Sequence, residues 1–322
     1  MARGTKDYPN DELDLEDVTF EENAENAAQD GHDAEPVDDE DDFWNEDDRD
    51  DDGYDEDTDK KKSKGIDIIR YFILVAAAIT FIVAVYMLAD IFLEYKKGVD
   101  IYESIGESVL VPVEKATGDG SKDSNQEGSE ALPFVYDHDA LLAINPEGQG
   151  YLYIPSIDLR LPIVQGTDNE YYLNHTFNKV YNGAGALFID SRIENGISGS
   201  NVIIYGHNMK NGSMFAGLTN YKNESFYNQS GNDVFYIYTG DKVREYRIFS
   251  AFENDPQGYV YTCNFKTPQQ LQEYAGTVKS YSLYDTKVDV SQASQVVTFS
   301  TCTSDGERRI VVQGIYVGER AL

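Results

Sequence analysis

The chain has 322 residues, a formal net charge of −32 and 41% hydrophobic residues. Residues 1–59 hold 27 Asp and Glu against 3 Lys and Arg, a net of −24, which leaves only −8 for residues 60–322. Such an acidic segment, poor in aliphatic side chains, cannot bury enough apolar surface to repay the entropy of folding, so it is excluded from any globular core. We predict that residues 1–65 form a disordered acidic tail. Two roles fit it, an interaction arm or the solvated spacer that we favour.

An uncharged stretch of 19 residues, "YFILVAAAITFIVAVYMLA", runs from Tyr71 to Ala89, and the apolar character continues to Leu93. About 20 such residues span a bilayer as a helix. The stretch is too long, and too far from the N-terminus, for an ordinary cleaved signal peptide. A buried core helix explains it less well, because such helices are rarely apolar on every face. We therefore predict a transmembrane helix over residues 66–95.

Positive charges predict the orientation of this helix. Only Lys96 and Lys97 follow the span closely. Several cations precede it: Lys60, Lys61, Lys62, Lys64 and Arg70. Segments rich in Lys and Arg stay on the cytoplasmic side, whereas acidic residues have little influence. The N-terminus is therefore expected in the cytoplasm, and the chain after about residue 95 outside the cell.

The chain has only two cysteines, Cys263 and Cys302, and both follow the predicted span. Extracellular redox conditions permit disulfides, so the first expectation is a bridge between them. No CxxC or HxxxH spacing of metal ligands occurs. We therefore expect no metal or other cofactor, and no nucleic-acid partner.

Gly, Ser, Asp and Glu dominate from Thr117 to Glu130. This composition is typical of a flexible stalk, which we place at residues 96–133, before a folded domain at residues 134–322. Two helices are expected in that domain, near Asp139–Ile144 and from Thr267, where Thr267 can cap and Pro268 can occupy the first turn. Eight short runs rich in Val, Ile, Tyr and Phe are predicted as strands: "GYLYIPSI", "LRLPIVQG", "GALFID", "NVIIYGH", "DVFYIYTG", "REYRIFSAF", "QVVTFSTC" and "RIVVQGIYV". A mainly β domain, either a closed barrel or a sandwich, follows.

Three side chains with complementary chemistry lie at predicted strand ends. His207 closes "NVIIYGH", Cys302 closes "VVTFSTC", and Arg309 opens the next strand. A hairpin would return the guanidinium beside the thiol, and positive charge from Arg or imidazolium favours the nucleophilic thiolate. The pattern indicates cysteine chemistry, but a disulfide or an inert buried thiol would also satisfy it.

Several motifs together resemble one family. "TCTSDGERRIVV" resembles the sortase signature, in which Thr-Cys precedes an Arg that opens a Val-rich strand. "NVIIYGHNMKNGSMFAGL" is similar to the histidine segment of class B sortases, as are "YLYIPSIDLRLPIVQGTDNEYYLNHTF", "AGALFID" and "KSYSLYDTKVDV" to other parts of that class. The resemblance runs from about residue 145 to residue 317, with the motifs in the family's order.

The resemblance implies a mainly β (α+β) sortase barrel of eight strands that carries a membrane-anchored cysteine transpeptidase. Such enzymes cleave the C-terminal sorting motif of secreted proteins after Thr through a thioacyl intermediate, which an amine of a peptidoglycan precursor of the lipid II type resolves. The resemblance implies that Cys302 is the nucleophile and that His207 is the general acid and base. It also implies that Arg309 is the oxyanion-stabilising cation, rather than Arg308, because Arg309 directly precedes "IVV". Matches to the family's groove positions imply four substrate-binding residues: Asn169, Leu173, Tyr205 and Ser300.

Two other functions remain open for this sequence. A pilin polymerase would use a pilin lysine as the acceptor, and an inactive domain would bind sorting motifs without cleaving them. In the enzymatic interpretations Cys263 is a free, partly buried thiol, because a bridge to Cys302 would silence catalysis. The type of sorting motif is not predicted.

Overall fold

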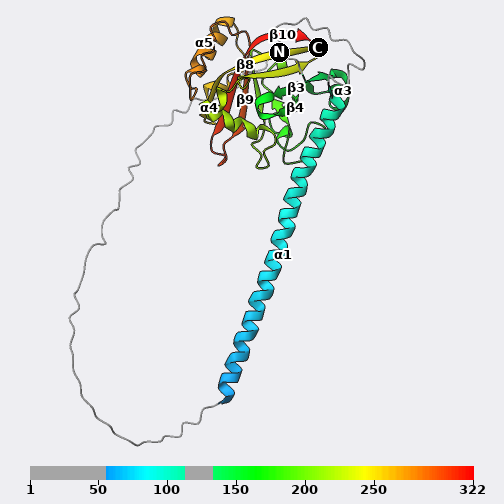
Figure 1. Ribbon diagram of the computed structural model, residues 1–322, viewed down its shortest axis with the longest axis vertical. Helices are drawn as coiled ribbons and strands as arrows, with labels where there is room; N and C mark the ends of the chain where they lie inside the picture. Colours follow the sequence, from blue (N-terminus) through cyan, green and yellow to red (C-terminus); the bar gives the residue numbers. More distant parts are fainter. Residues whose placement is uncertain (1–55, 113–132) are drawn as a thin grey trace, which may run out of the picture. The chain divides into compact units, whose positions relative to one another are not determined.

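The computed structural model describes residues 56–112 and 133–322 (Figure 1). The predicted acidic tail, up to residue 55, and much of the predicted stalk lie outside the described residues. A compact unit, Ile66–Leu322, contains the folded domain. The fold of this unit positions every predicted site residue.

The long helix α1 (Glu56–Val109) contains the predicted span. Its segment Ile68–Val109 is long and apolar enough to cross a membrane. The most apolar part of this segment has a mean hydropathy of 2.7, and none of its residues is buried. Beyond the exposed apolar stretch the helix becomes partly buried, since Tyr102, Ile105 and Val109 pack in the domain core. The helix therefore continues through the start of the predicted stalk and packs on the domain.

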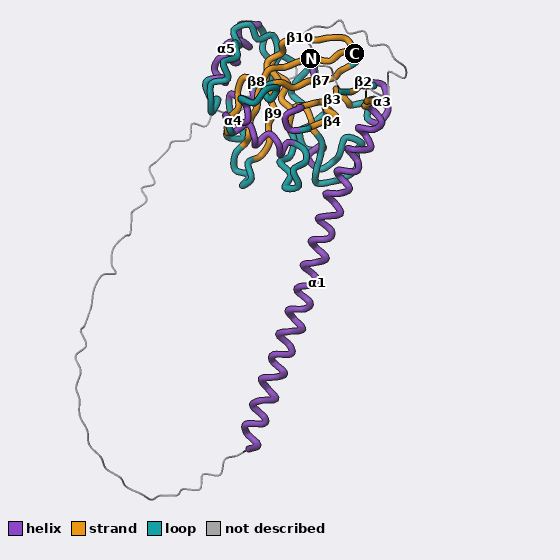
Figure 2. Tube along the Cα trace, in the orientation of Figure 1, coloured by secondary structure: helices purple, strands orange, loops and turns teal. Residues whose placement is uncertain are grey.

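Eight strands close into a barrel in the order β10-β8-β7-β3-β4-β5-β6-β9 (Figure 2). Their bounds are β3 Gly148–Ile154, β4 Leu159–Val164, β5 Leu187–Ile189, β6 Asn201–Tyr205, β7 Val234–Thr239, β8 Lys242–Asn254, β9 Val296–Cys302 and β10 Arg309–Ala321. Each corresponds to a predicted run, so the eight-stranded barrel is confirmed. Most neighbours are antiparallel, but β4 with β5 and β6 with β9 are parallel. Buried Val, Ile, Phe and Tyr side chains from these strands fill the core.

Both predicted helices are present. The first, α3 (His138–Ile144), is capped by the Asp137 carboxylate, which accepts from the backbone N–H of Ala140. The second, α5 (Pro268–Lys279), begins as predicted, since the Thr267 side chain accepts from the N–H of Gln270 and Pro268 occupies the first turn. Ser250 of β8 donates to the carbonyl of Val278 and holds α5 against the barrel.

Short elements complete the chain between these parts. A separate two-stranded sheet pairs β1 (Leu110–Pro112) with β2 (Phe134–Tyr136), which the sequence did not predict. One further short helix is α4 (Glu224–Tyr227). The 3-10 turns are η1 Pro155–Ile157, η2 Tyr171–Leu173, η3 Gly196–Ser198, η4 Phe215–Lys222 and η5 Tyr259–Tyr261. Two of them, η2 and η5, contribute walls of the pocket described next.

Candidate active site

The hairpin between β9 and β10 brings Cys302 and Arg309 together. Cys302 is the last residue of β9, Arg309 is the first of β10, and the two face each other as a cross-strand pair. The connecting loop closes through hydrogen bonds from Thr303 N to the Arg308 carbonyl (3.0 Å) and from Gly306 N to the Thr303 carbonyl (2.9 Å). Gly306 has a φ of +80°, a conformation that favours glycine. The sequence-based prediction of a hairpin that returns the arginine beside the thiol is confirmed.

Parallel pairing of β6 with β9 places His207 at the same barrel rim. Tyr205 of β6 pairs with Ser300 of β9, and His207 and Cys302 each lie two residues further along. The loop after β6 is tied to this rim, because the Asn208 side-chain amide donates to the carbonyl of Cys302 at 2.9 Å. Parallel strands point the same way, so their carboxyl ends meet at one edge. Residues 95 positions apart in sequence thus share one rim.

The imidazole of His207 is held by a backbone carbonyl. Its Nε2 lies 2.7 Å from the carbonyl oxygen of Leu173. A carbonyl oxygen can only accept, so Nε2 carries the proton and donates. This contact leaves Nδ1 as the nitrogen that can exchange a proton with a reacting group.

These residues line one pocket of about 260 Å³ at the rim. Its lining includes all seven predicted site residues: Asn169, Leu173, Tyr205, His207, Ser300, Cys302 and Arg309. Phe188, Pro256 and Tyr261 also line it and were missed by the sequence analysis. The Tyr261 hydroxyl lies 3.0 Å from the Ser300 hydroxyl, so this tyrosine helps to orient the side chain of a predicted substrate-binding residue. No local sequence pattern indicates a role for Tyr261, because it lies in η5, far in sequence from the motifs around His207 and Cys302.

A buried carboxylate braces the pocket wall. Asp190 follows β5, is fully buried, and accepts from the Arg192 guanidinium at 2.9 and 2.7 Å. It also accepts from the Tyr205 hydroxyl at 2.9 Å. The Arg192 guanidinium also donates to the Tyr261 carbonyl at 3.4 Å. The neighbouring Ser191 N–H donates to the Asn169 side chain at 2.8 Å. Sequence analysis missed this group; an Asp at a strand end with Arg two residues later was the signal available.

The charge on Asp190 is strongly favoured. Burial alone would raise the pKa of this carboxyl, but hydrogen bonds from Arg192, Asn169 and Tyr205 outweigh burial and lower the pKa to about 2. Each pKa unit corresponds to roughly 1.4 kcal/mol of preference for the charged form. The depressed pKa therefore stabilises the fold above the unfolded value near pH 4, and this stabilisation is lost as the pH falls toward 2.

We predict that Asp190→Asn lowers the free energy of unfolding at pH 7 by about 2 kcal/mol, because Arg192 and Tyr205 lose a charged acceptor. Between pH 4 and pH 2 the deficit should shrink, since the wild type then loses its advantage. Chemical denaturation of the full chain in detergent, followed by circular dichroism, measures both effects. The matched control is Asp158→Asn, which breaks an exposed pair with Arg160 at the same spacing and should cost only a few tenths of a kcal/mol. Equal losses in the two variants would contradict the bracing role.

The expected disulfide is not formed, because both cysteines are free. Cys302 is partly exposed at the pocket, whereas Cys263 is only 7% exposed and its Sγ faces the Tyr261 carbonyl at 3.5 Å. Burial raises the pKa of the Cys263 thiol, with a smaller contribution from the negative charge of Asp190. The first expectation of a bridge was wrong, and the free, buried Cys263 thiol of the enzymatic interpretation is confirmed. The fold places one thiol at the pocket and buries the other in the protein interior.

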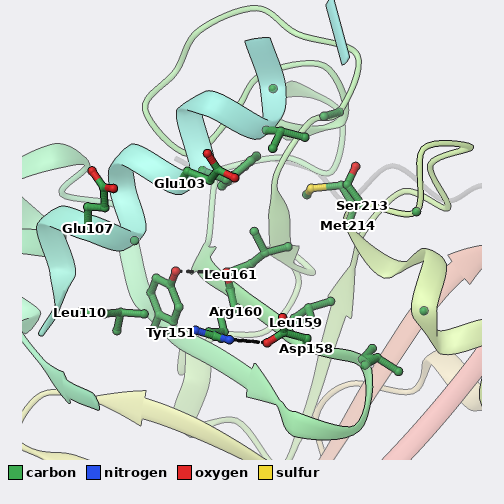
Figure 3. A pocket seen from close by; sticks show the side chains of 18 of the residues that line it. Glu103, Glu107, Leu110, Tyr151, Asp158, Leu159, Arg160, Leu161, Ser213 and Met214 are labelled. Atoms are coloured by element: carbon green, nitrogen blue, oxygen red, sulfur yellow. Dashed lines mark hydrogen bonds and ion pairs between the residues drawn. The ribbon is translucent and has the colours of Figure 1, made fainter. Parts of the chain in front are cut away.

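A larger cavity of about 820 Å³ lies elsewhere, between α1 and the barrel (Figure 3). Glu103 and Glu107 of α1 line one side, and Ser213 and Met214 line another. The Arg160 side chain pairs with Asp158 at its edge. The lining contains no cysteine or histidine, so the smaller rim pocket carries the candidate chemistry.

Comparison with known proteins agrees with this fold and rim. Residues 152–317 match the family model described as "Sortase domain". Sortase B of Listeria monocytogenes is 31% identical over 227 residues, which cover 70% of this chain and 90% of that protein. Sortase B of Staphylococcus aureus is 29% identical over 179 residues, covering 54% and 72%. The structure of Clostridium perfringens sortase B is similar with a TM-score of 0.51 and 30% identity, covering 56% of this chain and all of that one.

These matches to sortases, together with a cysteine, a histidine and an arginine at one rim of the barrel, identify the chain as a cysteine transpeptidase. The chain belongs to the sortase family, and its relatives place it in class B. The resemblance inferred from the motifs is therefore confirmed.

Proposed function

We propose that the protein is a membrane-anchored sortase that transfers secreted proteins carrying a C-terminal sorting motif to a peptidoglycan-precursor amine. The observation that carries this proposal is that Cys302, His207 and Arg309 line a single pocket with the four predicted substrate-binding residues. The apolar segment of α1 supports anchoring by one helix. The distribution of Lys and Arg supports a cytoplasmic N-terminus and an extracellular barrel.

In the first half-reaction the Cys302 thiolate attacks the carbonyl carbon of the Thr residue in the sorting motif. The oxygen of this carbonyl becomes an oxyanion, which the Arg309 guanidinium stabilises. His207 donates a proton from Nδ1 to the leaving amine as the C–N bond breaks. A thioester to Cys302 remains, and the C-terminal fragment departs.

In the second half-reaction the acceptor amine attacks the thioester carbonyl. His207, now neutral at Nδ1, accepts the proton that the amine loses, and Cys302 leaves as a thiolate. A new amide bond joins the secreted protein to the acceptor, and the enzyme returns to its starting state. During both steps the Leu173 carbonyl can hold Nε2–H, which stabilises the imidazolium when it forms.

Asn169, Leu173, Tyr205 and Ser300 would bind the motif in this scheme. Tyr205 and Ser300 stand side by side on β6 and β9, next to the nucleophile. Leu173 is 42% exposed, which suits an apolar contact with the peptide. These positions form the wall on which the peptide would lie as its scissile bond reaches Cys302.

The test uses the full chain in lipid nanodiscs with a library of peptides whose motifs begin NP, SP or LP. A peptidoglycan-type amine or a pilin-type lysine peptide is added as acceptor. We expect cleavage after Thr and joining to the peptidoglycan-type amine, detected by mass spectrometry. Joining to the lysine peptide alone would instead support pilin polymerisation. Binding without cleavage of any motif would identify an inactive binding domain.

A further inference from the structure

We propose that the end of α1 nearest the barrel positions His207, through the loop at residues 174–186 (the 174–186 loop). Tyr102 and Glu94 of α1 are then positioning residues for the transpeptidation reaction. This inference rests on the proposed role of His207 and goes beyond it, because it assigns part of the active-site geometry to the helix that carries the membrane-spanning segment.

The first step is the contact between Glu94 and the 174–186 loop. The Glu94 side-chain oxygen accepts from the N–H of Gly183 at 2.9 Å, and its backbone carbonyl accepts from the Asn182 side-chain amide at 3.0 Å. Gly98, one turn later, fits closely beside the loop: a Cβ there would lie 2.9 Å from the Asn182 side-chain oxygen. Helix and loop therefore pack without space for an intervening side chain.

The second step is a buried hydroxyl. Tyr102 is 8% exposed, and its hydroxyl donates to the carbonyl of Gly185. The same oxygen accepts from the N–H of Phe177 at 3.3 Å. One side chain of α1 thus joins both ends of the 174–186 loop. Removal of this hydroxyl would leave a buried N–H and a buried carbonyl without their partner, which favours a different loop position.

The third step connects Gly185 to the catalytic histidine. Gly185 has a φ of +59°, and a Cβ there would lie only 2.6 Å from the carbonyl oxygens of Tyr172 and Leu173. Ala186 N–H donates to the Tyr172 carbonyl at 2.9 Å. The Leu173 carbonyl, packed against Gly185, accepts from His207 Nε2. We therefore expect displacement of Gly185 to shift the neighbouring carbonyl that orients the imidazole.

The Glu94 and Tyr102 contacts lie next to the end of the apolar segment of α1. Glu94 directly follows Leu93, the last residue of the apolar stretch, and Tyr102 lies two helical turns further. The positioning contacts therefore begin where the membrane-spanning segment ends. A chain that keeps the barrel but loses α1 would lack both residues, and its His207 would be held less firmly.

The test measures alkylation of Cys302 by iodoacetamide against pH, in the full chain in nanodiscs, because this readout needs no substrate. Loss of the Tyr102 hydroxyl should loosen the Leu173 carbonyl and destabilise the His207 imidazolium that favours the thiolate. Tyr102→Phe should therefore be alkylated roughly two- to fivefold more slowly at pH 7, with a shifted pH profile. The other titratable groups that line the pocket, the Arg309 guanidinium and the phenols of Tyr205 and Tyr261, are unchanged in this variant.

Two controls separate positioning from general destabilisation. Tyr86→Phe makes the same chemical change on the same helix, at a side chain that is 74% exposed in the apolar segment, and should react like the wild type. Glu94→Ala should reproduce the Tyr102→Phe defect, whereas Glu94→Gln keeps an acceptor for Gly183 and should restore the wild-type rate. A wild-type rate and pH profile for both Tyr102→Phe and Glu94→Ala would overturn the inference. Failure of the wild type to cleave any sorting motif would refute the proposed function alone, and the alkylation result would still decide this point.

Discussion

Cys302→Ala is expected to abolish cleavage of the sorting motif, with a fall in kcat of about 10⁴-fold or more. The sulfur is the group that would form the covalent intermediate, so its removal leaves only binding and oxyanion stabilisation. Arg309 lies directly opposite on β10 and cannot replace a nucleophile. Release of the C-terminal fragment from a peptide, followed by liquid chromatography, measures the loss. Mass spectrometry should detect a thioacyl adduct on the wild type and none on the variant.

The chain provides its own matched control in Cys263→Ala. Cys263 lies outside the rim pocket and is almost fully buried, so its loss removes a sulfur atom without touching the candidate chemistry. We expect cleavage within about twofold of the wild type and a stability cost of about 1 kcal/mol from the small cavity. Persistent cleavage in Cys302→Ala, or its loss only in Cys263→Ala, would show that the nucleophile is assigned to the wrong cysteine.

The strands of the barrel could be predicted because their signal is local. The runs rich in Val, Ile, Tyr and Phe are separated by segments that contain Gly, Asn, Asp or Pro, and the structure has a strand at all eight. The cap at Thr267 is equally local, since the residues involved lie within one turn. By contrast, β1 and β2 are three residues each and pair across the stalk region, so no periodic pattern could show them.

The candidate site could be predicted only in part, because its supports are not local. Cys302 and Arg309 are joined by a short hairpin, and the family motifs point to His207. The contact of His207 with Leu173, however, crosses 34 residues. Asp190 and Tyr261 are ordinary residues in the sequence, and only the fold shows that they brace pocket residues. The cysteine count alone suggested a disulfide for the same reason, since the order of residues does not reveal which way a thiol faces, and only the family resemblance indicated a free Cys263.

The two adjacent arginines differ sharply in their surroundings. Arg309 is half-buried in the rim pocket, and its Nη1 donates to the carbonyls of Gly306 and Arg308 at 3.3 and 3.2 Å. Arg308 is exposed, does not line the rim pocket, and donates to the Glu253 carbonyl at 3.2 Å. Arg309 is the first residue of β10 and is fixed by the strand, whereas Arg308 is the last residue of the connecting loop.

Arg309→Lys is therefore expected to lower kcat/KM by about 10²-fold, whereas Arg308→Lys should change it by less than about twofold. Lysine keeps the charge at position 309 but loses the planar fork, which can hold the backbone carbonyls of the loop and the oxyanion together. Both variants carry the same conservative change at neighbouring positions, so a difference between them reports the position of the guanidinium alone. Steady-state kinetics with a cleavable sorting peptide measures it, and the reduction should fall mainly on kcat if the arginine binds the transition state more strongly than the substrate. A large loss in Arg308→Lys with none in Arg309→Lys would reverse the assignment. It would mean that the six-residue loop rearranges on substrate binding, so that the Arg308 guanidinium, which does not line the pocket in this structure, enters it.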